Sequence, residues 1–321
     1  MVALKNTGSS YKLSIVLPCF NEGQHLADFI NQLKVTIQNL SCSYEILIIN
    51  DGSTDNTRDI ALSLVQLGNL RYIEFSRNFG KESALMAGID HANSDAVLLI
   101  DADFQHPFNK LIEMELLWKK GYEMIYGVID NRAKDNWLKK MSTQFFYALM
   151  QSSEIVIPKN AGDFRWLDRK VVNALKQLPE RNRFMKGLYA WVGFKSIALP
   201  FEPHDRKSGK STFGITRLLR LGLAGLTSFS VIPLQLWIIV GALISLFAVL
   251  YGLYVVVDTF LYGNQVSGWP TLTVAIMLFS GIQLLSIGIL GEYIGKIFNE
   301  VKQRPLYLIS DHIASENIKV D

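Results

Sequence analysis

The sequence predicts an α/β domain with a mostly parallel sheet, followed by a hairpin of two membrane-spanning helices. Apolar, strand-like runs alternate with helical segments through the first third of the chain. Polar residues gather just after each of these runs. Beyond Val231, two stretches lack charged residues, and each is longer than the roughly 20 residues that cross a bilayer. The 321 residues suffice for a large domain together with such an anchor.

The spacing of apolar residues defines the first elements. Leu26, Phe29, Ile30 and Leu33 recur with the helical period. A later helix is expected to have its N-cap at Ser53 or Thr54. Strands are predicted at 13–21, 44–50, 70–76 and 95–101, and helices at 22–40, 51–67 and 80–92.

The carboxyl ends of the predicted strands carry the polar residues. Asp101 and Asp103 follow the apolar run 97–100, and Asp51 follows the second strand. Ligands of parallel α/β sheets bind at this edge. Two carboxylates one residue apart suit a divalent cation, Mg²⁺ or Mn²⁺, that shares its ligand shell with substrate phosphates. Asp-x-Asp pairs are common in loops, so this pair alone is weak evidence for a metal site. The polar residues at the other strand ends strengthen that evidence.

Several function classes are excluded. The chain lacks the glycine-rich dinucleotide fingerprint, the P-loop and the zinc-protease motif. A net charge of +3 is too small to indicate nucleic-acid binding. Cys19 and Cys42 have no metal-ligand spacing and need no disulfide, which fits a reducing compartment.

Six motifs together resemble the inverting family 2 glycosyltransferases of the GT-A fold. The resemblance is strongest to the polyprenyl-phosphate branch, which includes dolichyl-phosphate mannose synthases and bactoprenol glucosyltransferases, and it covers about residues 11–310. Asn50 departs from the pattern, because the family often has Asp there. The motifs are VLPCFNE, INDGSTDNT, SRNFGKESALMAGIDHA, DADFQHP, AGDFRWLDR and RKSGKSTF.

The resemblance implies a role for each matching residue. Asp51 would bind the nucleotide base, Asp103 the metal and Asp163 would be the catalytic carboxylate, acting with Asp101 and Asp103. The nucleotide-sugar site would comprise Pro18, Asn21, Glu22, Asp51, Asp101, Ala102, Gln105 and Arg132. The phosphates and the acceptor would be bound by Arg165, Arg206, Lys210 and Ser211.

The role of Asp163 stays open at this point. A polyprenyl phosphate has a second pKa near ~6 and is largely dianionic at neutral pH, so it needs little deprotonation. Asp163 would then orient the acceptor or stabilise charge on the sugar instead of acting as a base. The alternative interpretation is a carboxylate at the N-terminus of the helix that follows.

Two membrane spans are predicted, at 231–257 and 269–291. Arg217 and Arg220 precede the first span, and Lys296 and Lys302 follow the second. The positive-inside rule therefore places both termini in the cytoplasm. The resemblance to bactoprenol glucosyltransferases implies that the membrane is a bacterial plasma membrane. The alternative is a buried helical hairpin in a soluble core.

The predicted organisation has four parts. Segment 213–230 is interpreted as an interfacial amphipathic helix or as the positive flank of the first span. The polar tail after Pro305 is expected to be loosely ordered. The parts are a glycosyltransferase domain at 1–212, a juxtamembrane helix at 213–230, a transmembrane hairpin at 231–291 and a cytoplasmic tail at 292–321.

The resemblance implies transfer of a hexose to undecaprenyl phosphate, with glucose from UDP-glucose as the first choice. GDP-mannose, UDP-galactose and a UDP-aminoarabinose derivative stay open as donors. A processive polysaccharide synthase would carry a Q-x-x-R-W motif and more spans, and FRW here lacks the Gln. A non-catalytic membrane scaffold is opposed by the intact acidic residues. Relatives suggest a homo-oligomer, a tetramer.

Overall fold

A computed structural model describes residues 11–129, 158, 161–181, 183–203, 232–262 and 268–315. Every strand and helix predicted before residue 101 is present, although α2 begins at Thr57 after an N-cap at Asn56 and not at Ser53 or Thr54. In chain order the elements are β1 (Tyr11–Cys19), α1 (Gly23–Ile37), β2 (Cys42–Asn50), α2 (Thr57–Val65), β3 (Leu70–Phe75), α3 (Lys81–His91), β4 (Ala96–Leu99), α4 (Lys110–Lys119), β5 (Met124–Ile129), β6 (Ala161–Asp168), α6 (Arg169–Gln177), α7 (Met185–Trp191), β7 (Ser196–Phe201), α9 (Ile232–Tyr262), α10 (Trp269–Lys302) and β8 (Ile309–Ala314).

One sheet contains all these strands, in the order β7-β5-β6-β4-β1-β2-β3-β8. β1, β2, β3 and β4 are mutually parallel, and β5 is parallel to β7. β6 is antiparallel to both of its neighbours, and β8 is antiparallel to β3. The sheet is therefore mostly parallel, as predicted. Because β6 is reversed, its first residues lie at the same edge as the last residues of β4.

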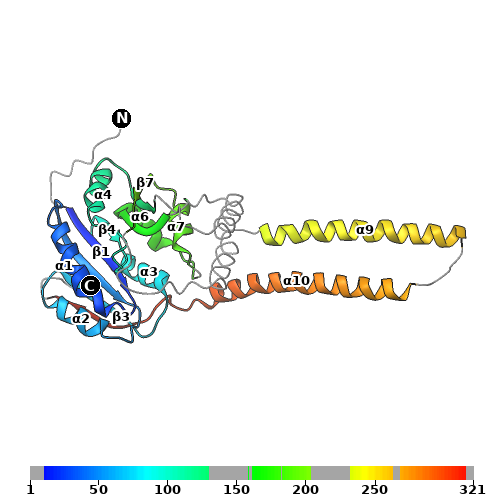
Figure 1. Ribbon diagram of the computed structural model, residues 1–321, viewed down its shortest axis with the longest axis horizontal. Coiled ribbons are helices and arrows are strands. Elements are labelled where there is room, and N and C mark those ends of the chain that lie inside the picture. Colours follow the sequence, from blue (N-terminus) through cyan, green and yellow to red (C-terminus); the bar gives the residue numbers. More distant parts are fainter. Residues whose placement is uncertain are drawn as a thin grey trace.

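Helices cover both faces of the sheet (Figure 1). α1, α2 and α4 enclose one hydrophobic core, which includes Phe29 and Trp118. α3, α6 and α7 enclose the other, which includes Leu85. Successive strand residues point to opposite faces, so Ile15 enters the first core and Val16 the second.

Helix α3 lies unusually close to β1. A Cβ atom at Gly88 would lie 2.0 Å from Cγ1 of Val16, so a larger residue has no room there. This close packing fixes the position of α3 on the sheet. Its first residue, Lys81, is thereby held at the carboxyl edge of the parallel strands.

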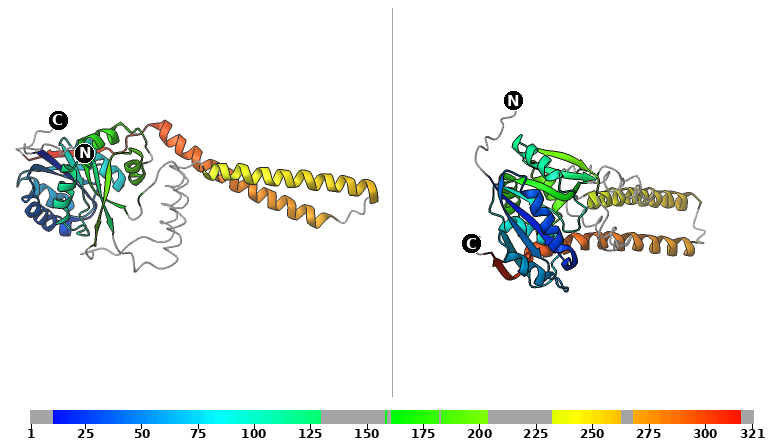
Figure 2. Two further views of the ribbon diagram at one scale, coloured as in Figure 1. Left: turned by 90° about the horizontal axis from the view of Figure 1, so that it is seen from above. Right: turned by 60° about the vertical axis from the view of Figure 1, so that its left-hand side comes forward.

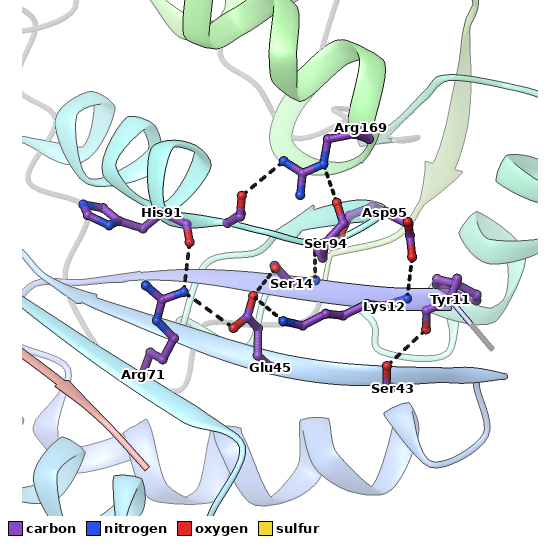
Figure 3. A network of polar contacts seen from close by, with 12 residues as sticks. Tyr11, Lys12, Ser14, Ser43, Glu45, Arg71, His91, Ser94, Asp95 and Arg169 are labelled. Carbon is purple, nitrogen blue, oxygen red and sulfur yellow. Dashed lines mark hydrogen bonds and ion pairs between the residues drawn. The ribbon is translucent and has the colours of Figure 1, made fainter. Parts of the chain in front are cut away.

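A buried polar network joins the central strands at the opposite edge (Figure 3). Glu45 of β2 is 1% exposed; it accepts a hydrogen bond from Oγ of Ser14 at 2.5 Å and lies 3.6 Å from Nη1 of Arg71. Arg71 donates to the carbonyl of His91, and Arg169 donates to the carbonyls just beyond it, at the end of α3. Sequence reasoning missed this network and expected the important polar residues at one edge alone.

Two long helices leave the sheet domain side by side, as Figures 1 and 2 show for α9 and α10. Among the described residues, Leu278–Lys302 is long and apolar enough to cross a membrane, with 25 residues and a mean hydropathy of 1.4. The first predicted span falls on α9, whose side chains are described only in part. The membrane crossing by α9 therefore stays a prediction. Segment 213–230 lies outside the described residues.

The chain returns to the sheet after α10. β8 pairs with β3, and Ser76 N donates to the carbonyl of Leu308 at 2.9 Å. Tyr307 stacks on Phe75 with ring centroids 4.9 Å apart, and its hydroxyl donates to Asp90 at 3.0 Å. The expectation of a loosely ordered tail is therefore wrong for 306–315. The reason is that unpaired backbone groups along β3 accept any strand of matching register, whatever its polarity.

Candidate active site

The loops after β1 and β2 interlock at the carboxyl edge of the sheet. Asn21 has a left-handed backbone (φ 58°). Its N–H donates to Oγ of Ser53 at 3.0 Å, and its side-chain oxygen accepts from Thr54 N at 2.8 Å. Glu22 N donates to Oγ1 of Thr57 at 2.9 Å. Half-buried Pro18 lies near the end of β1. The structure thus brings the predicted nucleotide residues of these two loops together.

Asp51 connects the turn after β2 to the loop before α3. Its Oδ1 accepts from Phe79 N at 2.6 Å, and its Oδ2 accepts from Gly80 N at 2.9 Å. Burial raises the pKa of Asp51, although these two N–H groups and Arg77 oppose the rise. The next residue, Gly52, also packs closely against the loop before α3. It has φ 64°, and a Cβ there would lie 2.5 Å from the carbonyl carbon of Arg77.

Asn50, the departure from the family pattern, is fully buried beside Asp51. Its amide nitrogen donates to the hydroxyl of Tyr72 at 2.7 Å. Its amide oxygen accepts from Ser53 N at 3.0 Å. An amide satisfies both partners, because it offers a donor and an acceptor together. Asn50 therefore supports the turn that carries Asp51.

The Asp101–Asp103 loop follows β4. Oδ2 of Asp101 lies 3.6 Å from Nε2 of His106. Oδ1 of Asp103 accepts from Gln105 N at 3.1 Å. Phe104, between Asp103 and Gln105, has φ 60°. Residues other than glycine rarely adopt this left-handed conformation, and those that do cluster at functional sites. Ala102, between the two aspartates, is buried.

Lys81 joins the two most important predicted carboxylates. Its Nζ lies 2.7 Å from Oδ2 of Asp101 and 2.9 Å from Oδ2 of Asp163. Burial would lower the pKa of Lys81, but the two carboxylates outweigh burial and raise it. Burial likewise would raise the pKa of Asp101, but Lys81 and His106 hold it well below its usual range. Sequence reasoning noted Lys81 at a strand end but gave it no role.

Asp163 lies in β6, near the start of the reversed strand. The alternative interpretation, a carboxylate at a helix N-terminus, is therefore wrong. That position belongs to Asp168, whose side chain accepts from Lys170 N at 3.0 Å as α6 begins. The second oxygen of Asp163, Oδ1, is buried without a hydrogen-bond partner. Burying such an oxygen is costly unless a ligand reaches it.

Glu82 is a further acidic residue of this cluster that sequence reasoning missed. Its Oε2 accepts from Met185 N at 2.9 Å, which ties α3 to α7. Burial and then the charge of Asp163 raise the pKa of Glu82 to about 7. Its place directly after Lys81, at the start of a helix, would have been the only signal in the sequence.

The acidic residues fit a divalent cation that a substrate helps to bind. Among the described residues, no three His, Cys, Asp or Glu side chains are arranged to hold a metal ion alone. Asp101 and Asp103 supply hard oxygen atoms from one loop, and diphosphate oxygens would have to complete the shell. Two carboxylates from one loop are too few to hold such an ion by themselves, so this donor set fits only a cation whose shell other oxygen ligands complete.

The remaining predicted residues are not part of this cluster. Arg165 is 1% exposed and lies inside the fold below Asp163, at the level of Leu99 of β4. Arg132, Arg206, Lys210 and Ser211 lie outside the described residues, so their predicted roles are not tested.

Known proteins with similar sequences are glycosyltransferases. The chain is 41% identical to an SfII prophage-derived bactoprenol glucosyl transferase of Shigella flexneri, over 93% of this chain and 97% of that one. It is 42% identical to an uncharacterised glycosyltransferase of Synechocystis sp., over 94% and 95% of the two chains. A solved glucosyl-3-phosphoglycerate synthase of Mycobacterium tuberculosis is 16% identical, over 71% and 83% of the chains, with a TM-score of 0.49.

The family model covers most of the sheet domain. Residues 14–176 match the model described as glycosyl transferase family 2. This range runs from β1 to α6, and it contains Asp51, Lys81, Asp101 and Asp163. With this match and relatives above 40% identity over nearly the whole chain, the protein is a member of glycosyltransferase family 2.

Proposed function

We propose that this enzyme transfers glucose from UDP-glucose to undecaprenyl phosphate, with inversion at the sugar, at the cytoplasmic face of a bacterial plasma membrane. The observation that carries the proposal is the meeting of Asp101, Lys81 and Asp163 at the carboxyl edge of the sheet. Full-length similarity to bactoprenol glucosyl transferases supports the choice of acceptor and sugar.

The donor would lie across the loops after β1, β2 and β4. Asn21, Glu22 and Asp51 would hold the nucleotide, and Asp101 and Gln105 the sugar. Asp103 would hold Mg²⁺ or Mn²⁺. When bound, such an ion would neutralise the charge that develops on the leaving diphosphate. Lys81 would add a fixed positive charge beside the sugar.

Asp163 would act on the acceptor side of the sugar. Its Oδ2 is held by Lys81, and its Oδ1 is buried without a hydrogen-bond partner. Since the acceptor phosphate is already anionic near neutral pH, we assign Asp163 to positioning and charge stabilisation ahead of base catalysis.

The membrane would present the lipid acceptor to this edge of the sheet. α9 and α10 would both cross the bilayer, and Arg132, Arg206, Lys210 and Ser211 would bind phosphates between the domain and the membrane. We further propose that the enzyme is a homo-oligomer, specifically a tetramer. Light scattering tests this by measuring the mass of the detergent-solubilised protein.

Radiolabelled UDP-glucose, undecaprenyl phosphate and the full-length protein in detergent test the function. Labelled lipid should form, and UDP-galactose, GDP-mannose and a UDP-aminoarabinose derivative should give less product. The Asp103→Asn variant or EDTA should lower the rate roughly a hundredfold, about 3 kcal/mol of lost stabilisation. Asp59→Asn, on an exposed face of α2, is the matched control. Lack of any labelled lipid with all four donors would refute the proposal.

A further inference from the structure

The last helix, α10, is longer than a membrane crossing requires. It has 34 residues, whereas roughly 20 cross the hydrocarbon core of a bilayer. The predicted span ends at 291, and the charged residues of α10 all follow it; they are Glu292, Lys296, Glu300 and Lys302. The helix therefore continues past the span for about three turns, and its end reaches the sheet domain (Figure 2).

The end of α10 is joined to the loop between α6 and α7. Both carboxylate oxygens of Glu300 accept from the backbone N–H of Arg181 at 2.9 Å. The guanidinium of Arg181 donates in turn to the carbonyl of Arg304, just beyond the helix, at 2.8 Å. A charged acceptor makes a hydrogen bond stronger than a neutral one does. The Glu300–Arg181 contact therefore ties the membrane anchor to the sheet domain.

The same loop reaches the catalytic cluster. Nη1 of Arg183 lies 2.9 Å from the sulfur of Met86, on α3. At the end of the loop, the N–H of Met185 donates to Oε2 of Glu82, which directly follows Lys81 in α3. The loop therefore lies between the end of α10 and the helix that carries the central lysine of the site.

The chain after α10 enters the sheet at the active-site edge. β8 is antiparallel to β3, and its first residue, Ile309, pairs with Phe75, the last residue of β3. β3 is parallel to β2 and β4, whose carboxyl ends precede Asp51 and Asp101. The anchor is therefore attached on the side of the sheet domain that carries the proposed reaction centre.

The direct link between α10 and β8 is not rigid by itself. Residues 303–306 form no helix or strand, and each such residue can rotate about two backbone dihedrals. A contact from the helix to the domain removes this freedom. The Glu300–Arg181 contact therefore restricts how far the sheet domain can tilt on α10.

We propose that Glu300 is a positioning residue, which through Arg181 fixes the active-site edge at one height and orientation relative to the bilayer. The inference rests on the proposed function, in which the acceptor is a membrane lipid. A phosphate at the bilayer surface moves little toward the site, so a tilting domain would rarely meet it in a reactive geometry. A soluble acceptor reaches the site by diffusion and does not need this contact.

Transfer to two acceptors tests the proposal, with the full-length protein in lipid nanodiscs. Undecaprenyl phosphate lies in the bilayer, and citronellyl phosphate, a short prenyl phosphate, is offered in water. Glu300→Ala should lower kcat/KM about tenfold or more for the first acceptor and less than twofold for the second. Glu300→Gln keeps an acceptor oxygen for the N–H of Arg181 and should restore most of the loss. Asn299→Ala, at an exposed neighbouring position of α10, is the matched control.

Energy transfer from the sheet domain to the bilayer measures the position without relying on activity. In a variant with Cys19 and Cys42 replaced by serine, a dye is attached to Leu67→Cys, an exposed site just after α2. Its distances to acceptor-labelled lipids should have a broader distribution when Glu300→Ala is added, and Asn299→Ala should leave the distribution unchanged.

The outcomes separate this proposal from the proposed function. Unchanged distances, or wild-type rates with both acceptors, would overturn the positioning role. An equal fall in rate with both acceptors would overturn it too, because Glu300 would then support the fold of the site in general. If the distances broaden but the wild type glucosylates neither acceptor, the proposed function fails and the positioning role of Glu300 stands.

Discussion

At the scale of single residues, Lys81 has the contacts of a residue that organises charge. Its Nζ lies within 3 Å of two carboxylates, one in the loop after β4 and one in β6. Without it, the negative charges of Asp101 and Asp163 would face each other without neutralisation and would repel each other. The electrostatic arrangement of the site would then change before any substrate arrived.

We therefore expect Lys81→Met to lower kcat about a hundredfold, the usual effect of removing one preorganised charge from a polar active site. Lys81→Arg should retain part of the activity, because it keeps the charge but not the compact shape of an ammonium group. Steady-state rates with UDP-glucose and the lipid acceptor measure both. Lys170→Ala is the control, and a kcat for Lys81→Met within twofold of wild type would contradict the role.

Glu82 predicts a dependence of stability on pH. Its pKa in the folded protein is about 7, compared with about 4.3 for an unperturbed glutamate. Because the folded-state pKa is raised, the folded protein retains this proton more strongly than the unfolded chain does. The stabilising contribution is complete below about pH 4.3 and is lost as pH rises through 7.

Glu82→Gln should remove this dependence and keep an acceptor for Met185 N. The variant should gain stability over the wild type as pH rises from about 4.5 to 7.5, with a difference of at most about 3 kcal/mol. Thermal unfolding at several pH values measures the difference. A constant gap between the two proteins across this range would show that Glu82 is ionised in the fold.

At the scale of elements, sequence patterns predicted the helices and strands that depend on residues close together in the chain. The runs in β1 to β4 are apolar because both faces of a central parallel strand are buried, and their ends predicted Asp51, Asp101 and Asp103. Lys81 could not be assigned a role, since a lysine at the start of a helix looks like an ordinary solvated residue. Its function depends on β6, which joins the sheet from more than 60 residues further along the chain.

β8 could not be predicted for a related reason. Its sequence, ISDHIA, is short and half polar, and only the free edge of β3 gives it a partner. Arg58 strengthens the attachment through ion pairs with Glu74 of β3 and Asp311 of β8. Long-range pairing of this kind leaves no periodic signal in one sequence.

Ending the chain after Pro305 should destabilise the sheet domain, because it removes β8 and the stacking of Tyr307 on Phe75. Several backbone hydrogen bonds at about 0.5–1.5 kcal/mol each correspond to a fall in Tm of about 4 °C or more for a domain of this size. Ending it after Glu316 keeps β8 and is the control. Equal melting temperatures for the two truncated proteins in detergent would show that β8 contributes nothing.

At the scale of the whole molecule, the sheet domain and both termini should lie on the cytoplasmic side. Lysine and arginine flank the helical pair and are missing from residues 258–268. In a variant without Cys19 and Cys42, Asn264→Cys should react with an impermeant maleimide on intact cells. Ser310→Cys should react only after permeabilisation. The reverse pattern would overturn the orientation.

The place of β8 also determines when the domain can be completed during synthesis. The strand that covers the edge of β3 follows both long helices in the chain, so it leaves the ribosome after them. Until then, β3 presents an open row of backbone groups, which other chains can pair with. A polypeptide that stops before or within its anchor therefore keeps an open strand edge that can aggregate, and only a chain translated through β8 covers it.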